Sequence, residues 1–504
     1  MSIDYLGQQV NYDTEFETVV GLEVHVQLAT DSKIFSPAKS RLPQDGSVAE
    51  EATNANTTEI CAGHPGTLPA LNETAVEYAI RAGLATNCRI NLKSIFARKH
   101  YFYADLPKGY QISQFDLPLC VNGFLNIELG VEGETTKRIG ITRIHMEEDA
   151  GKSVHEYGYS LINLNRAGTP LVEVVSEPDL RTPEEAGAYL RKLYAIVTAL
   201  GICDGNLQEG NFRCDANVSV RPKGSTRFGT RTEIKNVNSF RFVEKAIEYE
   251  AERQRQVILS GDRVVQETRL YDAQKNQTYT MRAKEEAEDY RYFPDPDLPP
   301  LVLDSEYVES IRNSLPELPD DMRDRFVKEY GITRYDAGVL VSQKSMARFF
   351  EESVSVDGGD SLAKTVANLL IGEAARLLNE AGIAIRASRF KPEHFTELAK
   401  LISEKTISVT AAKQVIGILW NEGGTVTAVS EIVEREGLKQ VNDLSSLEPI
   451  IAQIILDNPK QAEEFRAGKD KLIGFFVGQA MKATQGKANP AMLQELVLKK
   501  LKEQ

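Results

Sequence analysis

Residues 21–28 read Gly21-Leu22-Glu23-Val24-His25-Val26-Gln27-Leu28, and this alternation sets the architecture of the first part of the chain. Successive side chains of a β-strand point to opposite faces, so the apolar residues share one face and Glu23, His25 and Gln27 share the other. The stretch therefore predicts a strand with one buried and one polar face. Two interpretations of the polar face stay open: a solvated surface, or one wall of an acidic pocket that holds a metal ion.

Three later stretches repeat this pattern and add ionisable side chains. Residues 144–149 alternate as far as Glu148, which falls on the apolar side unless the strand bends or ends there. A strand through Asp215 has a polar face, and residues 231–235 place Glu233 between two basic residues. Adjacent carboxylates repel one another, so a cation is expected to offset their charge. Four such strands favour a metal and phosphate site as much as they favour four solvated faces.

Helix signals lie between these strands. Asn72, Thr182 and Ser239 are each placed to cap a helix, because their side-chain oxygens can accept a hydrogen bond from the first turn. Residues 171–175 are interpreted as an apolar, β-branched strand. Residues 1–293 therefore predict a mixed α/β domain in which these helices are scaffold.

A proline-rich run, residues 294–300, marks the expected boundary of this domain, because proline disfavours regular structure. From about residue 316 the patterns are mostly helical, and no cluster of potential ligands stands out. The second half is therefore interpreted as a binding or docking module.

Length and composition narrow the protein class. The chain has 504 residues, of which 42% are hydrophobic and 26% charged, as expected of a globular protein with two to four domains. No apolar run reaches the roughly 18 residues of a membrane span, and the start resembles no signal peptide, so we expect a cytosolic protein. A net charge of −14 argues against broad nucleic-acid binding, although residues 461–504 carry eight Lys/Arg against five Asp/Glu.

The cysteines give no sign of a disulfide framework or a zinc site. Five cysteines form no Cys-x-x-Cys pair, which suits a reducing compartment. Cys61 and His64 make one isolated Cys-x-x-His, which is half of a zinc ligand set at most. A structural zinc ion is not expected.

Five segments resemble the B subunits of tRNA-dependent amidotransferases, the GatB family, and they occur in the order found in that family. The segments are residues 17–26, 110–116, 145–152, 165–171 and 213–219. The resemblance extends over essentially the whole chain. It implies an α+β multidomain protein: an α/β cradle domain with an antiparallel-rich sheet (1–293), a helical domain (294–405) and a helical tail resembling the YqeY proteins that contacts tRNA (406–504).

The resemblance also implies an activity. ATP phosphorylates the side-chain carboxylate of Glu on the glutamine tRNA, or of Asp on the asparagine tRNA, and ammonia then displaces phosphate. Mg²⁺ suits this chemistry because it prefers oxygen ligands and bridges phosphates. Carried over from the family, the metal-binding residues are Glu23, His25, Glu147 and Glu148. The catalytic residues carried over are Lys99, Glu148, Asp215 and Glu233. Asp215 and Glu233 complete the acidic pocket, and Lys99 lies where a cation could either meet the phosphate or line the path of ammonia.

Other polypeptides are implied as well. Release of ammonia from glutamine needs an activated nucleophile, and no credible Cys or Ser arrangement occurs in this sequence. The resemblance implies an amidase-type glutaminase (GatA) and a small third component (GatC), which form a heterotrimeric ligase with this chain. Two alternatives stay open: a tRNA-binding scaffold with structural acidic strands, and a stand-alone metal-dependent hydrolase. The sequence leaves open whether Glu-tRNA, Asp-tRNA or both are substrates.

Overall fold

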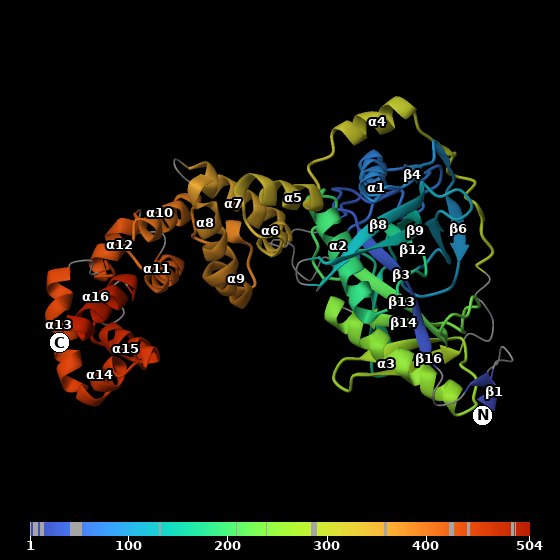
Figure 1. Ribbon diagram of the computed structural model, residues 1–504. Coiled ribbons are helices and arrows are strands. Elements are labelled where there is room, and N and C mark those ends of the chain that lie inside the picture. The colour runs from blue at the N-terminus through green and yellow to red at the C-terminus, as the bar shows by residue number, and fades with distance from the viewer. Residues whose placement is uncertain are drawn as a thin grey trace. The chain divides into compact units, whose positions relative to one another are not determined.

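The computed structural model of the protein forms two compact units, residues 1–319 and 320–504 (Figure 1). The structure describes residues 2–3, 9–10, 15–40, 53–130, 133–207, 209–237, 239–283, 290–356, 360–422, 428–440, 444–484, 488 and 490–503.

A nine-stranded sheet forms the centre of the first unit. In spatial order its strands are β16 (Gln277–Ala283), β15 (Glu267–Asp272), β14 (Thr232–Val237), β13 (Phe212–Pro222), β3 (Phe16–Gln27), β12 (Pro170–Ser176), β9 (Thr135–Glu148), β8 (Cys120–Leu129) and β4 (Arg89–Ile90). Neighbours run antiparallel except β14 and β15, which are parallel. The predicted antiparallel-rich sheet and the α+β class are confirmed.

Strand β3 lies in the middle of the sheet, and its two faces differ as the alternation predicts. Leu22, Val24 and Val26 are buried in the main core, whereas Glu23 and His25 are partly exposed on the other face. The apolar face of the sheet is covered by three helices (Figure 1). They are α1 (Glu73–Ala85), α2 (Pro183–Ala199) and α3 (Phe240–Leu259).

The three predicted helix caps are confirmed. The side chain of Asn72 accepts a hydrogen bond from the backbone N–H of Ala75, and Thr182 and Ser239 do the same at the starts of α2 and α3. Each cap satisfies a backbone donor that has no partner inside its helix. Local sequence therefore positions the scaffold on the buried face.

A smaller sheet lies beside the end of β9. It consists of β6 (Ala97–His100), β7 (Tyr110–Ser113) and β17 (Phe293–Pro294), with β6 in the middle. Strand β7 contacts β9, which places this sheet next to the polar face of the large one. The remaining strand pairs are β1 (Ser2–Ile3) with β2 (Gln9–Val10), β5 (Lys93–Ser94) with β18 (Leu301–Val302), and β10 (Lys152–Glu156) with β11 (Tyr159–Asn163).

The first unit extends beyond the boundary that the sequence suggests at residue 293. The proline-rich run is flanked by β17 and β18, and both pair with strands of the first unit. Proline is tolerated at the edge of a sheet, where its missing N–H costs no ladder bond. Helix α4 (Ser305–Asn313) contacts α1, and Leu318 packs against the main core. The unit therefore ends at Pro319.

The second unit is helical in its described residues and contains two separate cores. One core runs from Phe326 to Val433 and the other from Leu447 to Leu501. The boundary suggested at residue 405 falls inside the first of these cores, because α11 and α12 pack onto it. The α-helices of the first core are α5 (Pro319–Tyr330), α6 (Arg334–Val341), α7 (Lys344–Ser355), α8 (Ala363–Leu369), α9 (Ala375–Ala381), α10 (Pro392–Ser403), α11 (Val409–Glu422) and α12 (Val429–Arg435). Those of the second are α13 (Leu444–Asp457), α14 (Pro459–Arg466), α15 (Ile473–Ala483) and α16 (Pro490–Glu503).

Within the described residues, none of the helices has both the length and the apolar character needed to cross a membrane.

Candidate functional site

The polar face of the large sheet gathers titratable side chains from neighbouring strands. In the ladder, Glu173 on β12 lies directly opposite His25 on β3 and opposite His145 on β9. Glu147 follows two residues after His145 and therefore points to the same face. The register of three antiparallel strands thus brings His25, Glu147 and Glu173 together.

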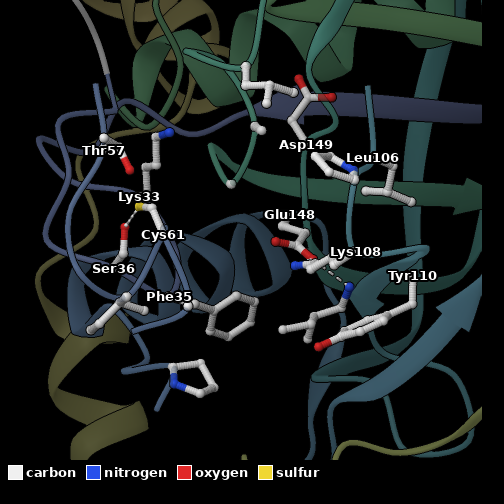
Figure 2. A pocket seen from close by; sticks show the side chains of 18 of the residues that line it. Lys33, Phe35, Ser36, Thr57, Cys61, Leu106, Lys108, Tyr110, Glu148 and Asp149 are labelled. Carbon is white, nitrogen blue, oxygen red and sulfur yellow. Dashed lines mark hydrogen bonds and ion pairs between the residues drawn. The ribbon is translucent and has the colours of Figure 1, made fainter. Parts of the chain in front are cut away.

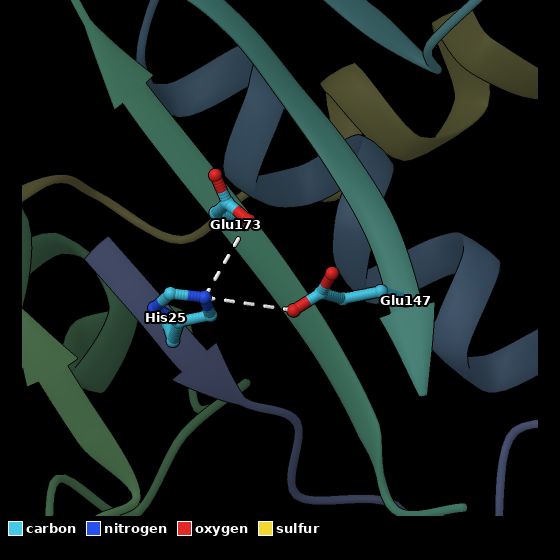
Figure 3. Close-up of side chains that lie close together, drawn as sticks. All are labelled: His25, Glu147 and Glu173. Atoms are coloured by element: carbon cyan, nitrogen blue, oxygen red, sulfur yellow. Dashed lines mark ion pairs between the residues drawn. The ribbon is translucent and has the colours of Figure 1, made fainter. Parts of the chain in front are cut away.

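These three side chains form a compact cluster, which we call the acidic cluster (Figure 3). His25 Nε2 lies 3.4 Å from a carboxylate oxygen of Glu173 and 3.6 Å from one of Glu147. One potential ligand atom from each residue lies within 4.8 Å of the other two. Glu147 and Glu173 are buried, while His25 is half-buried, so the cluster opens on the side of the imidazole.

The two carboxylates of the acidic cluster are in different electrostatic settings. Burial would raise the pKa of Glu173, but the neighbouring His145 and His25 lower it. Burial, and then the charge of Glu173, raises the pKa of Glu147. Burial alone would lower the pKa of His25, but the hydrogen bond and charge of Glu173, together with Glu147, raise it to about 9. Burial lowers the pKa of His145 to about 4. An imidazolium at His25 therefore supplies positive charge between two buried carboxylates.

A second polar group continues the same face across β13 and β14. Glu23 lies opposite Asp215 in the ladder, and Lys235 Nζ is 2.7 Å from Asp215 and 3.0 Å from Glu233. Burial, followed by the charges of Glu173 and Glu233, raises the pKa of Glu23. The two acidic partners raise the pKa of Lys235 despite its burial. Lys235 therefore stays a cation beside the acidic cluster.

Lys99 comes from the smaller sheet and faces this polar surface. Together with His25, Glu147, Tyr101 and Arg213 it lines a small cleft of about 180 Å³. Burial would lower the pKa of Lys99, but the charges of Glu147 and Glu173 raise it. The cleft thus has carboxylates on its floor and a lysine in its wall.

Glu148 lies apart from the other predicted site residues. Its carboxylate accepts hydrogen bonds from Lys108 Nζ and, at 2.8 Å, from the backbone N–H of Ile112. It lines a larger cavity of about 410 Å³, together with Lys33 and Cys61 (Figure 2). Strand β9 ends at Glu148, so the side chains of residues 147 and 148 leave the strand on opposite sides. This is the placement on the apolar side that the alternation indicates.

Asp149 separates the two cavities and lines both. Its carboxylate is 3.2 Å from Arg213 Nη2 and 3.3 Å from Arg166 Nε. Its charge is therefore offset by two guanidinium groups, whereas the two carboxylates of the acidic cluster share one imidazolium.

The acidic cluster offers a donor set that fits a divalent cation. Two buried carboxylates supply the oxygen atoms that Mg²⁺ prefers, and the elevated pKa of Glu147 shows that a further positive charge would be stabilised there. An imidazole nitrogen is also a common ligand of other divalent metals. An ion bound here would share the two carboxylates with the His25 ring.

Cys61 lies in the wall of the larger cavity. Its Sγ is 3.0 Å from Ser36 Oγ and 3.5 Å from Thr58 Oγ. Among the described residues, no group of three His, Cys, Asp or Glu side chains with metal-ligand spacing gathers around it.

Sequence reasoning missed Glu173 and assigned no role to Lys235. Residues 171–175 are strongly apolar, and this composition conceals the one carboxylate at the centre of the strand. A charged residue in the middle of a buried run is itself a signal, because burying an unpaired charge is costly. The signal points to an ionic partner but does not identify it.

Comparison with known proteins gives matches over nearly the whole chain. Residues 18–309 match the GatB/GatE catalytic domain, and residues 348–501 match the GatB domain. The chain is 57% identical to the B component of the aspartyl/glutamyl-tRNA(Asn/Gln) amidotransferase of Trichlorobacter lovleyi over 487 residues, 96% of this chain and 99% of that protein. The protein of the same description from Halorhodospira halophila is 55% identical over 489 residues, 97% of this chain and 99% of that protein.

Proposed function

Because this chain belongs to the GatB/GatE family of amidotransferase B subunits, we propose that the acidic cluster and Lys99 form the site where a tRNA-linked carboxylate is activated and amidated. The chain is a subunit of a tRNA-dependent amidotransferase, a multi-subunit ligase that acts in translation. The observation that supports the placement of the reaction is the pair of buried carboxylates, Glu147 and Glu173, held next to His25 and Lys99.

Activation is needed because a carboxylate is a poor acyl donor. A carboxylate oxygen of the substrate attacks the γ-phosphorus of ATP, ADP leaves, and an acyl phosphate forms. The nitrogen of ammonia then attacks the acyl carbon, phosphate leaves and the nitrogen loses a proton, which gives the amide. Phosphoryl transfer depends on positioning and on neutralising charge more than on covalent help.

Two cationic side chains, one in the cleft and one beside it on the large sheet, match this requirement. Lys99 faces the acidic cluster from the smaller sheet, and Lys235 lies between Asp215 and Glu233 on the large one. Their elevated pKa values keep both lysines charged at neutral pH. We propose that Lys99 meets the transferred phosphoryl group, and that Asp215 and Glu233 hold Lys235 beside the polyphosphate.

We propose that Glu147 and Glu173 hold Mg²⁺, and that the His25 imidazolium releases its proton to solvent when the ion binds, so that its ring nitrogen completes the set. When bound, this ion neutralises phosphate oxygens and orients the polyphosphate for in-line transfer. Glu23 continues the acidic floor next to this set and orients Asn217, which donates a 3.0 Å hydrogen bond to it. Glu148 takes a separate role: its ion pair with Lys108 fastens the smaller sheet to the end of β9.

Ammonia must come from another polypeptide in this proposal. We propose that an amidase-type glutaminase (GatA) produces it and that a small third component (GatC) completes a heterotrimer. The relatives' description names both aspartyl and glutamyl tRNA, and either can be the substrate of this chain. Charged tRNA is used in the cytoplasm, and we place the complex there.

For the C-terminal core, we propose a tRNA contact. Residues 461–504 have the positive charge balance noted above, and the core from Leu447 to Leu501 is separate from the core before it. Deletion of residues 441–504 is expected to weaken tRNA binding and to leave the first unit folded, because no helix of either preceding core is removed. Unchanged tRNA affinity in the truncated complex would contradict the proposal.

The main test measures γ-phosphate release from ATP by the heterotrimer, with and without mischarged tRNA. We expect release to require the tRNA and to be lost in Glu147→Gln. A matched control is Glu15→Gln, which changes an exposed carboxylate directly before β3. Release that survives Glu147→Gln in a folded complex would move the kinase step elsewhere and favour the scaffold alternative. Turnover without tRNA or partners would favour a stand-alone hydrolase.

A further inference from the structure

Five aromatic rings form a continuous row that meets the cleft at one of its members, Tyr101. The row, which we call the aromatic row, consists of Tyr103, Tyr101, Tyr290, Tyr292 and Phe115. Successive ring centroids are 5.8, 6.2, 5.9 and 4.3 Å apart. The last pair is stacked with an angle of 7° between the ring planes. The rings come from chain segments far apart in sequence, so the row is a product of the fold.

The two ends of the aromatic row are exposed, while one member reaches the cleft. Tyr103 is 54% exposed and Phe115 is 47% exposed. Tyr101 lines the same cleft as His25 and Glu147, and its hydroxyl donates a hydrogen bond of 3.1 Å to Gln111. The three rings between them are half-buried, so the two ends are the parts of the row that are most open to a ligand.

The charge along the aromatic row favours an anionic partner. Lys99 Nζ lies 4.7 Å from the ring centroid of Tyr290 and 5.8 Å from that of Tyr101. The cleft itself, in contrast, is lined by the carboxylate of Glu147, and the carboxylate of Glu173 lies behind it, next to His25. A partner that presents flat, uncharged groups to the rings and keeps its negative charges near the lysine fits both features.

We propose that the aromatic row binds the unpaired 3′ nucleotides of the substrate tRNA by stacking, and so leads the aminoacyl group to the acidic cluster. This inference rests on the proposed function, because the acyl group is joined to the last of these nucleotides. Unpaired bases stack on aromatic side chains whatever their sequence, and a neighbouring cation adds to the attraction. Stacked bases turn their rings to the protein, which keeps the phosphates away from the carboxylates.

The test measures binding of tRNA to the complete heterotrimer, without turnover. Tyr103→Ala and Phe115→Ala are each expected to weaken binding about tenfold, because each removes one stacking surface. Tyr103→Phe and Phe115→Tyr keep an aromatic ring and are expected to stay within about twofold of the original affinity. Tyr157→Ala is the matched control, since Tyr157 is fully exposed on the turn between β10 and β11, outside the row.

A tRNA that lacks its unpaired 3′ nucleotides completes the experiment. We expect the alanine variants and the original complex to bind this shortened tRNA equally. An equal loss with both tRNAs, or no loss with either, would overturn the proposal. A raised KM for ATP with unchanged tRNA affinity would assign the rings to adenine instead, and failure of the alanine variants to assemble would assign them to an interface within the heterotrimer; both results contradict the proposal.

The test of the aromatic row can fail or succeed independently of the test of the proposed kinase site. Glu147→Gln is expected to bind full-length tRNA like the original complex while it loses phosphate release. If phosphate release survives in that variant, the placement of the kinase step fails, yet the tRNA binding series still decides the role of the aromatic row.

Discussion

Glu147 and Glu148 are adjacent in sequence, equally buried, and placed in opposite electrostatic settings. Glu147 lies among Glu173, His25 and, farther away, Lys99, and its pKa is raised. Glu148 lies on the other side of the strand end, where Lys108 and the backbone N–H of Ile112 satisfy its carboxylate. A bound cation can therefore still balance the charge of Glu147, whereas Lys108 already balances the charge of Glu148.

The contrast shows that two equally buried carboxylates can differ in role: one can bind a ligand, and the other stabilises the fold. A buried carboxylate beside another carboxylate destabilises the fold unless a cation joins it, and this kind of strain is common at functional sites. A buried carboxylate with a complete set of donors stabilises the contact between two segments. The first kind of residue is expected to govern activity, and the second kind to govern stability.

The strongest effect is expected on activity. Glu147→Gln should reduce phosphate release by at least about a hundredfold, because a proposed ligand of Mg²⁺ is lost and with it the positive charge beside the reacting phosphoryl group. Glu148→Gln should reduce it by less than about tenfold, since in our proposal this carboxylate only fastens the smaller sheet. Rates are measured on the heterotrimer with mischarged tRNA and saturating ATP. Equal losses in the two variants would remove the distinction between the two carboxylates.

The next effect concerns the metal. Glu173→Gln should raise the Mg²⁺ concentration needed for half-maximal phosphate release by about 10- to 100-fold, because a neutral amide oxygen replaces a charged carboxylate as the proposed ligand. Lys108→Met, in the cavity of Glu148, should leave the Mg²⁺ dependence unchanged. The measurement is a Mg²⁺ titration at fixed tRNA and ATP. An unchanged titration in Glu173→Gln would remove this residue from the metal site.

Stability should respond in the opposite order. Glu148→Gln should lower the free energy of unfolding of the first unit by about 1–3 kcal/mol, because Lys108 loses its ionic partner. Glu147→Gln should leave the Tm nearly unchanged, since relief of its repulsion with Glu173 offsets the loss of its attraction to His25. Thermal unfolding followed by circular dichroism provides the measurement, with Lys108→Met and the double variant as a thermodynamic cycle. A lower Tm for Glu147→Gln than for Glu148→Gln would reverse our assignment.

The weakest effect is expected at Cys61, in the wall of the Glu148 cavity. Cys61→Ser should change the free energy of unfolding by no more than about 0.5 kcal/mol, as is usual for exposed positions. Elemental analysis of the purified complex should find no stoichiometric zinc. Zinc that is present in the original protein and lost in the variant would show that the cavity holds a metal of its own.

Much of the scaffold could be predicted from local sequence. Two kinds of short-range feature could be recognised in the sequence because they depend only on neighbouring residues. They are the alternation in β3 and β13 and the helix caps at Asn72, Thr182 and Ser239. The side on which Glu148 leaves β9 also followed from alternation.

The partners of these residues could not be predicted in the same way. Glu173 meets His25 and His145 because β12 lies between β3 and β9, and strand order depends on contacts between distant segments. The end of the first unit at Pro319 likewise depends on the contact between α4 and α1. No local sequence pattern predicts this contact. Local sequence patterns predict which side chains share one face of a strand, whereas the tertiary fold determines which strands lie side by side.

The central place of β3 bears on how the protein is made. Its residues 16–27 are among the first to leave the ribosome, but its neighbours β12 and β13 begin only at residues 170 and 212. At about 5–20 residues per second, the ribosome needs roughly 10–40 s to complete β13 after β3. During that time the apolar face and both edges of β3 lack their native neighbours. Nascent chains are therefore expected to need chaperone protection, and slow synthesis near residue 212 would prolong the exposure.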